Sequence, residues 1–161
     1  MRSSNARWYV FGFASLALAT LGMMATASSA RANVDADVRA GVYSEADAVA
    51  IGGGVLTPVT THSNWFFNPN VEVAMGERRD IVAMSGDFHY DFAQKSNASF
   101  WVGGGPAVLV TNPSEGDTHT DVGMNVLTGV GARRGQVRPF AQLRGTMADN
   151  SMLAIAGGIR F

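Results

Sequence analysis

The chain has 161 residues, of which 47% are hydrophobic and 16% charged, with 19 glycines and no cysteine. Twelve basic residues against thirteen acidic ones leave no basic surface of the kind that binds nucleic acid. Without cysteine the chain has no disulfide framework and no thiolate zinc site, and its apolar content is too high for a disordered tail.

The first 32 residues have the composition of an export signal. Arg2 and Arg7 precede an uncharged stretch over 8–25, and small residues ending in Ala30-Arg31-Ala32 follow it. This order matches the basic, apolar and A-x-A regions of a secretory signal. We predict a cleaved signal peptide over 1–32 and a mature domain over 33–161, the alternative being a permanent membrane anchor.

Beyond the predicted signal, apolar and polar residues alternate with period two, the pattern of strands whose two faces differ. Turn chemistry divides this part into eight segments, connected by short turns that suit antiparallel neighbours. Segments of about ten residues are long enough to cross a bilayer when tilted, and closure into a barrel removes the free edges of the sheet. The predicted strands cover 34–44, 48–56, 64–76, 80–92, 99–111, 119–133, 137–147 and 151–161.

The fold class predicted from this pattern is all-β: an eight-stranded antiparallel up-and-down transmembrane β-barrel. Pro106 lies inside the fifth segment, where it lacks a ladder donor and predicts a bulge.

The charged residues share one face of the strands with many glycines and alanines. In a narrow barrel, such small residues leave room for long polar side chains, whereas on an outer surface they would gain little. We therefore expect the polar face to line the lumen as a paired, hydrogen-bonded network that fills it, and the apolar face to contact lipid. The alternative is that these are the scattered surface charges of a soluble barrel. The predicted luminal residues are Asp37, Arg39, Glu72, Asp87, His89, Asp91, Asp121, Asn125, Arg133, Gln142, Arg144 and Arg160.

Aromatic residues lie near the ends of several segments, at one predicted membrane boundary. An aromatic girdle of this kind is typical of membrane barrels. The predicted girdle comprises Trp65, Phe67, Phe100, Trp101 and Phe161.

The export signal, the eight alternating segments, the glycine-rich pieces AIGGGVL, FWVGGGPAVLV and VLTGVGARR, and the ending GGIRF together resemble one family. It is the family of small outer-membrane β-barrels of Gram-negative bacteria that includes OmpX and the OmpA transmembrane domain. The last segment, with outward Leu153, Ile155, Ile159 and Phe161, is similar to the signal that the barrel-assembly machinery recognises.

The resemblance implies a monomer in the outer membrane, in contact with its lipids and with a role in envelope stability, adhesion or stress resistance. The alternatives are a channel or binding barrel for small or hydrophobic solutes and, third, an enzyme that modifies envelope lipids.

Residues that could carry chemistry do not form a convincing site. The glycine triplets at 52–54 and 103–105 are not followed by the Lys-Ser/Thr of a phosphate loop. His62 and Ser63 are adjacent, so in a strand they would point to opposite faces.

Two further groups of polar residues invite comparison with metal sites. Asp87, His89 and Asp91 share a face but are spaced widely for one metal ion, and we expect them to pair with luminal arginines. The connection over 112–121 lacks the spacing of a calcium loop. We predict no catalytic residues, no metal and no cofactor.

Overall fold

Eight strands and one short 3-10 turn make up the regular structure of the part of the chain that is described. The computed structural model describes residues 34–60, 63–92, 97–114 and 116–161, so the predicted signal peptide lies outside it. Within those ranges no helix is long and apolar enough to cross a membrane. The elements are β1 (Asp35–Tyr43), η1 (Ser44–Ala46), β2 (Ala48–Pro58), β3 (Trp65–Gly76), β4 (Arg79–Phe92), β5 (Ala98–Pro113), β6 (His119–Ala132), β7 (Arg138–Met147) and β8 (Met152–Arg160).

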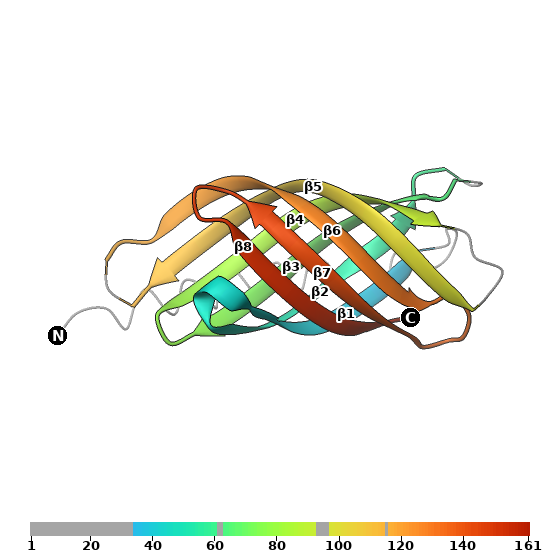
Figure 1. Ribbon diagram of the computed structural model, residues 1–161, viewed down its shortest axis with the longest axis horizontal. Coiled ribbons are helices and arrows are strands. Elements are labelled where there is room, and N and C mark those ends of the chain that lie inside the picture. The colour runs from blue at the N-terminus through green and yellow to red at the C-terminus, as the bar shows by residue number, and fades with distance from the viewer. Residues whose placement is uncertain (1–33, 61–62, 93–96, 115) are drawn as a thin grey trace.

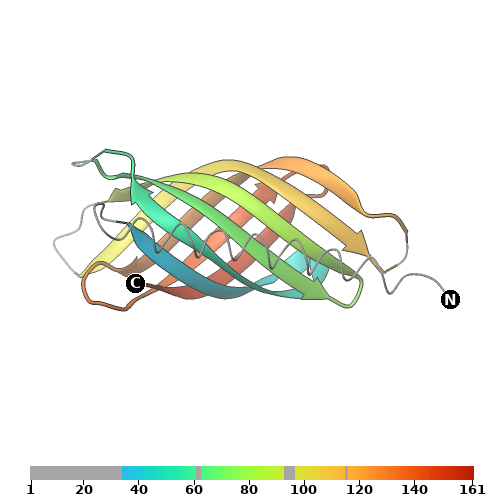
Figure 2. The ribbon, with the colours of Figure 1, turned by 180° about the vertical axis from the view of Figure 1, so that it is seen from behind.

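The strands form a closed antiparallel barrel in chain order (Figures 1 and 2). β1 and β8 close it, with Asp37 opposite Arg160 and Tyr43 opposite Ala154. Closure leaves no free edge on which another chain could pair. The predicted up-and-down barrel is confirmed, and every predicted segment begins and ends within two residues of the observed strand.

The two ends of the barrel differ in their connections. The η1 end carries η1 and the turns after β3, β5 and β7, and its connections span two to five residues. The terminal end, where β1 begins and β8 ends, carries three connections of five or six residues. Both ends of the barrel sequence lie together because the number of strands is even.

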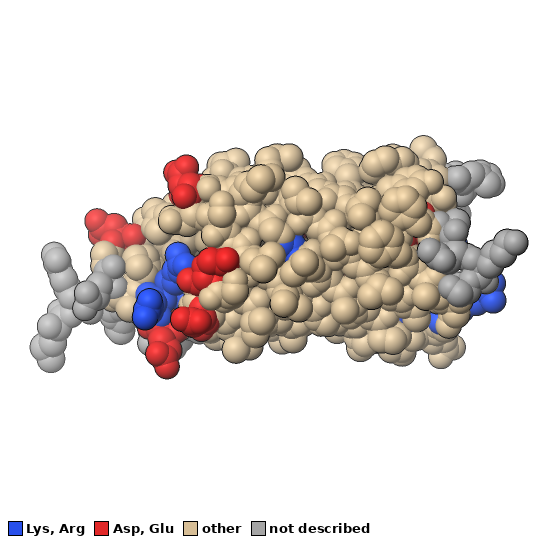
Figure 3. Space-filling view, viewed as in Figure 1, with Lys and Arg blue, Asp and Glu red and all other residues tan. Residues whose placement is uncertain are grey.

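The outward face of the wall is apolar. Cross-strand partners point to the same side of a sheet, so the pairing registers separate the inward from the outward residues. Figure 3 shows the charges of one face gathered at the two ends of the barrel, with a nearly uncharged band between them. This is the orientation of a membrane barrel and not of a soluble one. Exposed apolar residues of the wall include Val38, Val49, Ile51, Val122, Val126, Val130 and Ile155.

Pro106 does not produce the predicted bulge. Ser85 pairs with Ala107 on one side of it and Phe88 with Gly104 on the other, at the same register, so no extra residue is inserted. Pro106 itself lies opposite Met124 on β6. The sheet accommodates the missing donor by leaving two β4–β5 positions unpaired.

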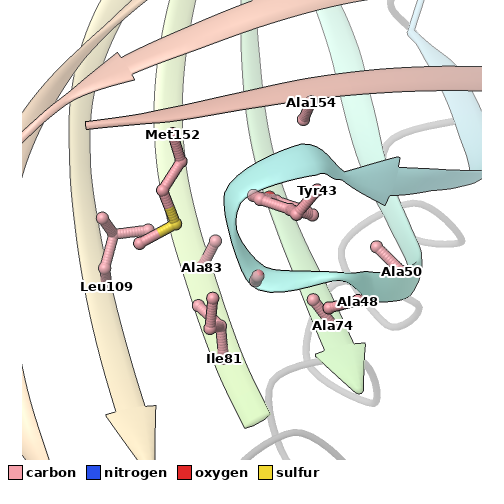
Figure 4. Close-up of a cluster of buried hydrophobic side chains, with 10 residues drawn as sticks. Tyr43, Ala48, Ala50, Ala74, Ile81, Ala83, Leu109, Met152 and Ala154 are labelled. Carbon is pink, nitrogen blue, oxygen red and sulfur yellow. The ribbon is translucent and has the colours of Figure 1, made fainter. Parts of the chain in front are cut away.

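A second finding that the sequence pattern did not predict is an apolar plug inside the lumen at the η1 end (Figure 4). Ile81 and Leu109 are almost fully buried there, and Met152 packs with them. The turn η1 contributes the buried Ala46. The remaining members of the plug are Tyr43, Ala48, Ala50, Ala74, Ala83 and Ala154.

Candidate functional site in the barrel lumen

The polar residues that point inward meet in the lumen beside the apolar plug. Strand alternation aims every second side chain of β1, β3, β4, β6 and β7 at the barrel axis. Glycines oppose the long side chains across the sheet: Gly52 lies opposite Arg39 on one side and Glu72 on the other. A Cβ at Gly52 would overlap the Glu72 side chain, so glycine is what makes room for the carboxylate.

Glu72 is the centre of one group of contacts. It forms an ion pair with Arg144, and both side chains are 4% exposed. The hydroxyl of Tyr43 donates to Oε2 of Glu72 at 2.8 Å, and Nη2 of Arg144 donates to the same hydroxyl at 2.8 Å. Nη1 of Arg39 lies 3.6 Å from Oε1 of Glu72, so two cations face one carboxylate.

Asp37 forms a second ion pair nearer the terminal end. Nε and Nη2 of Arg39 donate to its two oxygens, each at 2.7 Å, in the bidentate geometry that suits a guanidinium. Asn68 accepts from Arg39 at 2.9 Å and donates to Asp37 at 3.2 Å. The pair is thus held from β1 and from β3.

Asp87 accepts two amide hydrogen bonds instead of pairing directly with an arginine. Asn70 donates to one oxygen at 3.0 Å and Asn125 to the other at 2.8 Å. The hydroxyl of Thr146 donates to Asn125 at 2.7 Å, and Arg144 donates to Asn70 at 3.3 Å. These bonds connect the Asp87 group to the Glu72 group.

Four buried members of this network were not predicted from the sequence: Tyr43, Asn68, Asn70 and Thr146. Each occupies the same alternating face as a predicted luminal charge on its own strand, and each is buried. They could have been predicted by assigning to the lumen every polar residue that alternates in phase with a luminal charge on the same strand.

An aromatic group lies in the lumen toward the terminal end. His89 stacks on Trp101 with ring centroids 5.8 Å apart. The guanidinium of Arg160 lies 4.4 Å from the centroid of Trp101 and 4.7 Å from that of Phe140. Cation–π contact of this kind favours an arginine in a site from which water is excluded.

Trp101 was wrongly assigned to the girdle. It is 0% exposed and lies opposite Gly129, inside the barrel. Phe100 precedes it and is 41% exposed, because neighbouring residues of a strand point to opposite faces. Alternation therefore allows only one of the two to contact lipid.

The other predicted luminal residues have different environments. Gln142 is buried, and Asp91 accepts a hydrogen bond from Ser99. Asp121 lies 3.5 Å from His119 near the rim of the η1 end. Arg133 is exposed and not enclosed as predicted, because β6 ends at Ala132 and the chain turns there.

Outward aromatic residues cluster at the terminal end, where the girdle was expected. Trp65 packs edge-on against Tyr90 with centroids 5.3 Å apart, and Phe92 lies beside Phe100. The remaining predicted girdle members, Phe67 and Phe161, lie on the same outward side near this end; Phe161 is 53% exposed. In β8 and just after it, Leu153, Ile155, Ile159 and Phe161 alternate outward.

The groups considered for chemistry each have separate contacts. Asp87, His89 and Asp91 are engaged by amides, by Trp101 and by Ser99 respectively. Within the described ranges no cluster of three or more His, Asp or Glu side chains could hold a metal ion. Ser63 accepts from the backbone of Trp65 at 2.9 Å, while His62 and Glu115 lie outside the described residues.

The exposed turn η1 is held by hydrogen bonds to two other strands. Glu45 accepts from the backbone N–H of Leu153 at 2.7 Å and from the hydroxyl of Ser44 at 2.6 Å. These bonds lower the pKa of Glu45, the bond from Leu153 most of all. Arg79 donates to the carbonyl of Glu45 at 2.7 Å.

No protein-family model and no curated protein matches the sequence. Solved structures do match in fold. The N-terminal β-barrel domain of OprF from Pseudomonas aeruginosa has a TM-score of 0.64 at 16% identity, over 80% of this chain and 96% of that one. Neisserial surface protein A has a TM-score of 0.60 at 16% identity, over 79% and 92%.

The outer membrane enzyme PagL has a TM-score of 0.52 at 9% identity, over 79% of this chain and 98% of that one. At sequence identities of 9–16%, the likeness concerns the fold alone. The closed register, the polar lumen and the apolar wall agree with it. The chain has the fold of the small eight-stranded outer-membrane β-barrels.

Proposed function

We propose that this protein is a structural barrel of the outer membrane whose lumen does not conduct solutes. It acts through its wall and its η1-end turns, in envelope stability or in contact at the cell surface. The observation that carries the proposal is the filling of the lumen. The interior of an eight-stranded barrel is just wide enough for side chains, and here ion pairs, amides and the apolar plug occupy it.

The orientation follows from the export signal and the even number of strands. The first and the last strand of the barrel both have their chain termini at the terminal end. In an exported chain this end faces the periplasm, and the η1 end faces the outside of the cell. The predicted signal peptide at 1–32 accounts for the export. Leu153, Ile155, Ile159 and Phe161 are the residues that the barrel-assembly machinery would recognise, because they alternate outward along β8 and just after it.

The short turns of the η1 end support a structural role over the binding of a large partner. The connection after β3 has two residues, and the backbone N–H of Ser114 in the next turn donates to the carbonyl of Arg78 at 2.8 Å. The hydroxyl of Ser114 donates to the carbonyl of Glu77 at 2.9 Å. The two turns are thus tied together and present a small surface.

Swelling of liposomes in small sugars tests the closed lumen. Vesicles containing the purified barrel should swell no faster than protein-free vesicles, while vesicles with a large porin, as the positive control, should swell readily. Swelling that increases with the amount of this barrel would refute the proposal and support the channel alternative.

Two measurements separate location and catalysis from conduction. Membrane fractionation, with a gel shift on heating, should place a folded barrel in the outer membrane. Mass spectra of the envelope lipids should be unchanged by expression. New lipid masses that disappear on replacing His62 or Ser63 would support the enzyme alternative.

A further inference from the structure

Two hollows lie on the outward wall. The first, of about 470 Å³, lies at the terminal end and is lined by Ala98, Val130, Ala132, Pro139 and Ala141 among others. The second, of about 680 Å³, is lined by residues that include Val102, Gly104, Thr128, Leu143 and Gly145. Both are open depressions in the wall and not enclosed cavities.

The hollows form because small residues interrupt the apolar wall. Val126 on β6 is paired with Gly104 on β5 and with Gly145 on β7. Two of these three adjacent outward positions in the second hollow are therefore glycine. At Gly145 an added Cβ would meet nothing within 4 Å. The space next to Gly145 is therefore open to the outside of the barrel.

The two hollows follow each other along the strands. On β6 the outward residue after Val130 is Thr128, and on β7 the one after Ala141 is Leu143, so the hollows adjoin along these two strands, while on β5 the outward Phe100 lies between Ala98 and Val102. From Ala98 to Gly104 the path covers six residues of β5, about 20 Å at the strand rise. With a tilt of about 45° this spans about 14 Å along the axis, roughly half of a hydrocarbon core of about 30 Å.

The lining favours a hydrocarbon chain as the occupant. The hydroxyl of Thr128 donates to the carbonyl of Trp101 at 3.1 Å and so is already satisfied by the barrel. The other residues named above present apolar side chains or glycine. A second copy of the barrel would present a convex wall, which is a poor match for a narrow groove that runs along the axis for the length of one leaflet.

The turn between β6 and β7, next to the first hollow, carries basic residues. Arg133 and Arg134 follow β6 directly and are both exposed. The backbone N–H of Arg133 donates to the carbonyl of Asn97, which also lines this hollow. Guanidinium groups bind phosphate oxygens through charge-assisted hydrogen bonds, and basic residues at a membrane surface attract anionic lipids.

We propose that the hollows and this turn together form a binding site for one anionic glycerophospholipid. Its phosphate lies beside Arg133 and Arg134, and one acyl chain follows the hollows to Gly145. The proposal rests on the membrane placement in the proposed function but not on the closed lumen, so a conducting barrel would leave it intact.

Native mass spectrometry tests the site. The barrel is reconstituted into vesicles of phosphatidylethanolamine and phosphatidylglycerol, then extracted in a mild detergent. Wild type should retain one lipid, with phosphatidylglycerol preferred. Gly145→Leu should lower the ratio of lipid-bound to lipid-free barrel about tenfold, the effect of losing ~1.4 kcal/mol of contact energy. Gly157→Leu is the matched control, because Gly157 also faces outward, an added Cβ there would meet only the carbonyl oxygen of Phe140 at 3.8 Å, and Gly157 is not among the lining residues.

The arginines are tested with the double variant Arg133→Gln and Arg134→Gln. It should retain lipid but lose the preference for phosphatidylglycerol over phosphatidylethanolamine. A heat-dependent gel shift checks that every variant is folded. The proposal is overturned if wild type retains no lipid, if Gly145→Leu and Gly157→Leu behave alike, or if the spectra show a dimer that Gly145→Leu abolishes.

Discussion

Replacing Arg144 with alanine should destabilise the barrel more than any exposed substitution. Arg144 is 3% exposed, pairs with Glu72, and donates to the hydroxyl of Tyr43 and to Asn70. Its removal leaves Glu72 buried with one hydroxyl donor and with Arg39 at 3.6 Å. The carboxylate would then be held mainly by a longer and weaker contact.

The magnitude follows from what remains around Glu72. Breaking a buried ion pair by removing one partner costs about 3–5 kcal/mol, because the other charge stays buried. Since Arg39 still faces the carboxylate, we expect a loss at the lower end, about 3 kcal/mol. The double variant Glu72→Gln with Arg144→Met should lose less, since it leaves neither charge uncompensated.

Urea unfolding in lipid vesicles measures this difference, with tryptophan emission reporting the barrel and the heat-dependent gel shift confirming the folded fraction. Asp87→Ala is a companion variant, since it removes the acceptor of two amide bonds. Losses below about 1 kcal/mol for both Arg144→Ala and Asp87→Ala would mean that these side chains contact water, and the enclosed network would be wrong.

Three further changes test separate parts of the barrel. Gly129→Ala should lower the free energy of unfolding by about 1–3 kcal/mol in the same urea assay, because its Cβ would overlap the indole of Trp101. Gly145→Ala should change the stability little, and equal effects of the two substitutions would contradict this packing. Leu109→Ala, in the apolar plug, should cost about 2–5 kcal/mol, and a neutral result would mean that the plug is loosely packed. The pKa of Glu45 is lowered from 4.5 in the folded state, so its stabilising bonds are present above that pH and are lost as the pH falls through the folded value. The protection factor of the Leu153 backbone amide, which corrects the hydrogen-exchange rate for the intrinsic effect of pH, should therefore fall on acidification in wild type, and Glu45→Gln should remove that pH dependence.

Much of the fold could be predicted from the sequence because strand alternation is a local property. In β1, β4 and β6 most charged residues share one parity, and short turns then favour antiparallel neighbours. The same parity placed Asp37, Glu72 and Arg144 inside the barrel, where the structure has them buried. Arg133 was misplaced because a parity argument holds only while the strand continues.

Which side chains pair could not be predicted from the sequence. Glu72 and Arg144 are 72 residues apart, and Arg39 and Asn68 are 29 apart, so their contacts depend on the register and curvature of the closed sheet. The apolar plug was missed for a related reason. Ile81 and Leu109 alternate in phase with the inward charged residues but are apolar. The sequence does not show how much side-chain volume fills the lumen at each height along the barrel axis.

The sequence by itself determined that the chain forms eight two-faced strands, because alternation with period two can bury only one face of each. Tertiary closure decided which polar groups meet, that aromatic and aliphatic residues share the interior with them, and where the wall is hollow. These properties arise from side chains of different strands at the same height in the barrel, and that height is set by the register of all eight strands together.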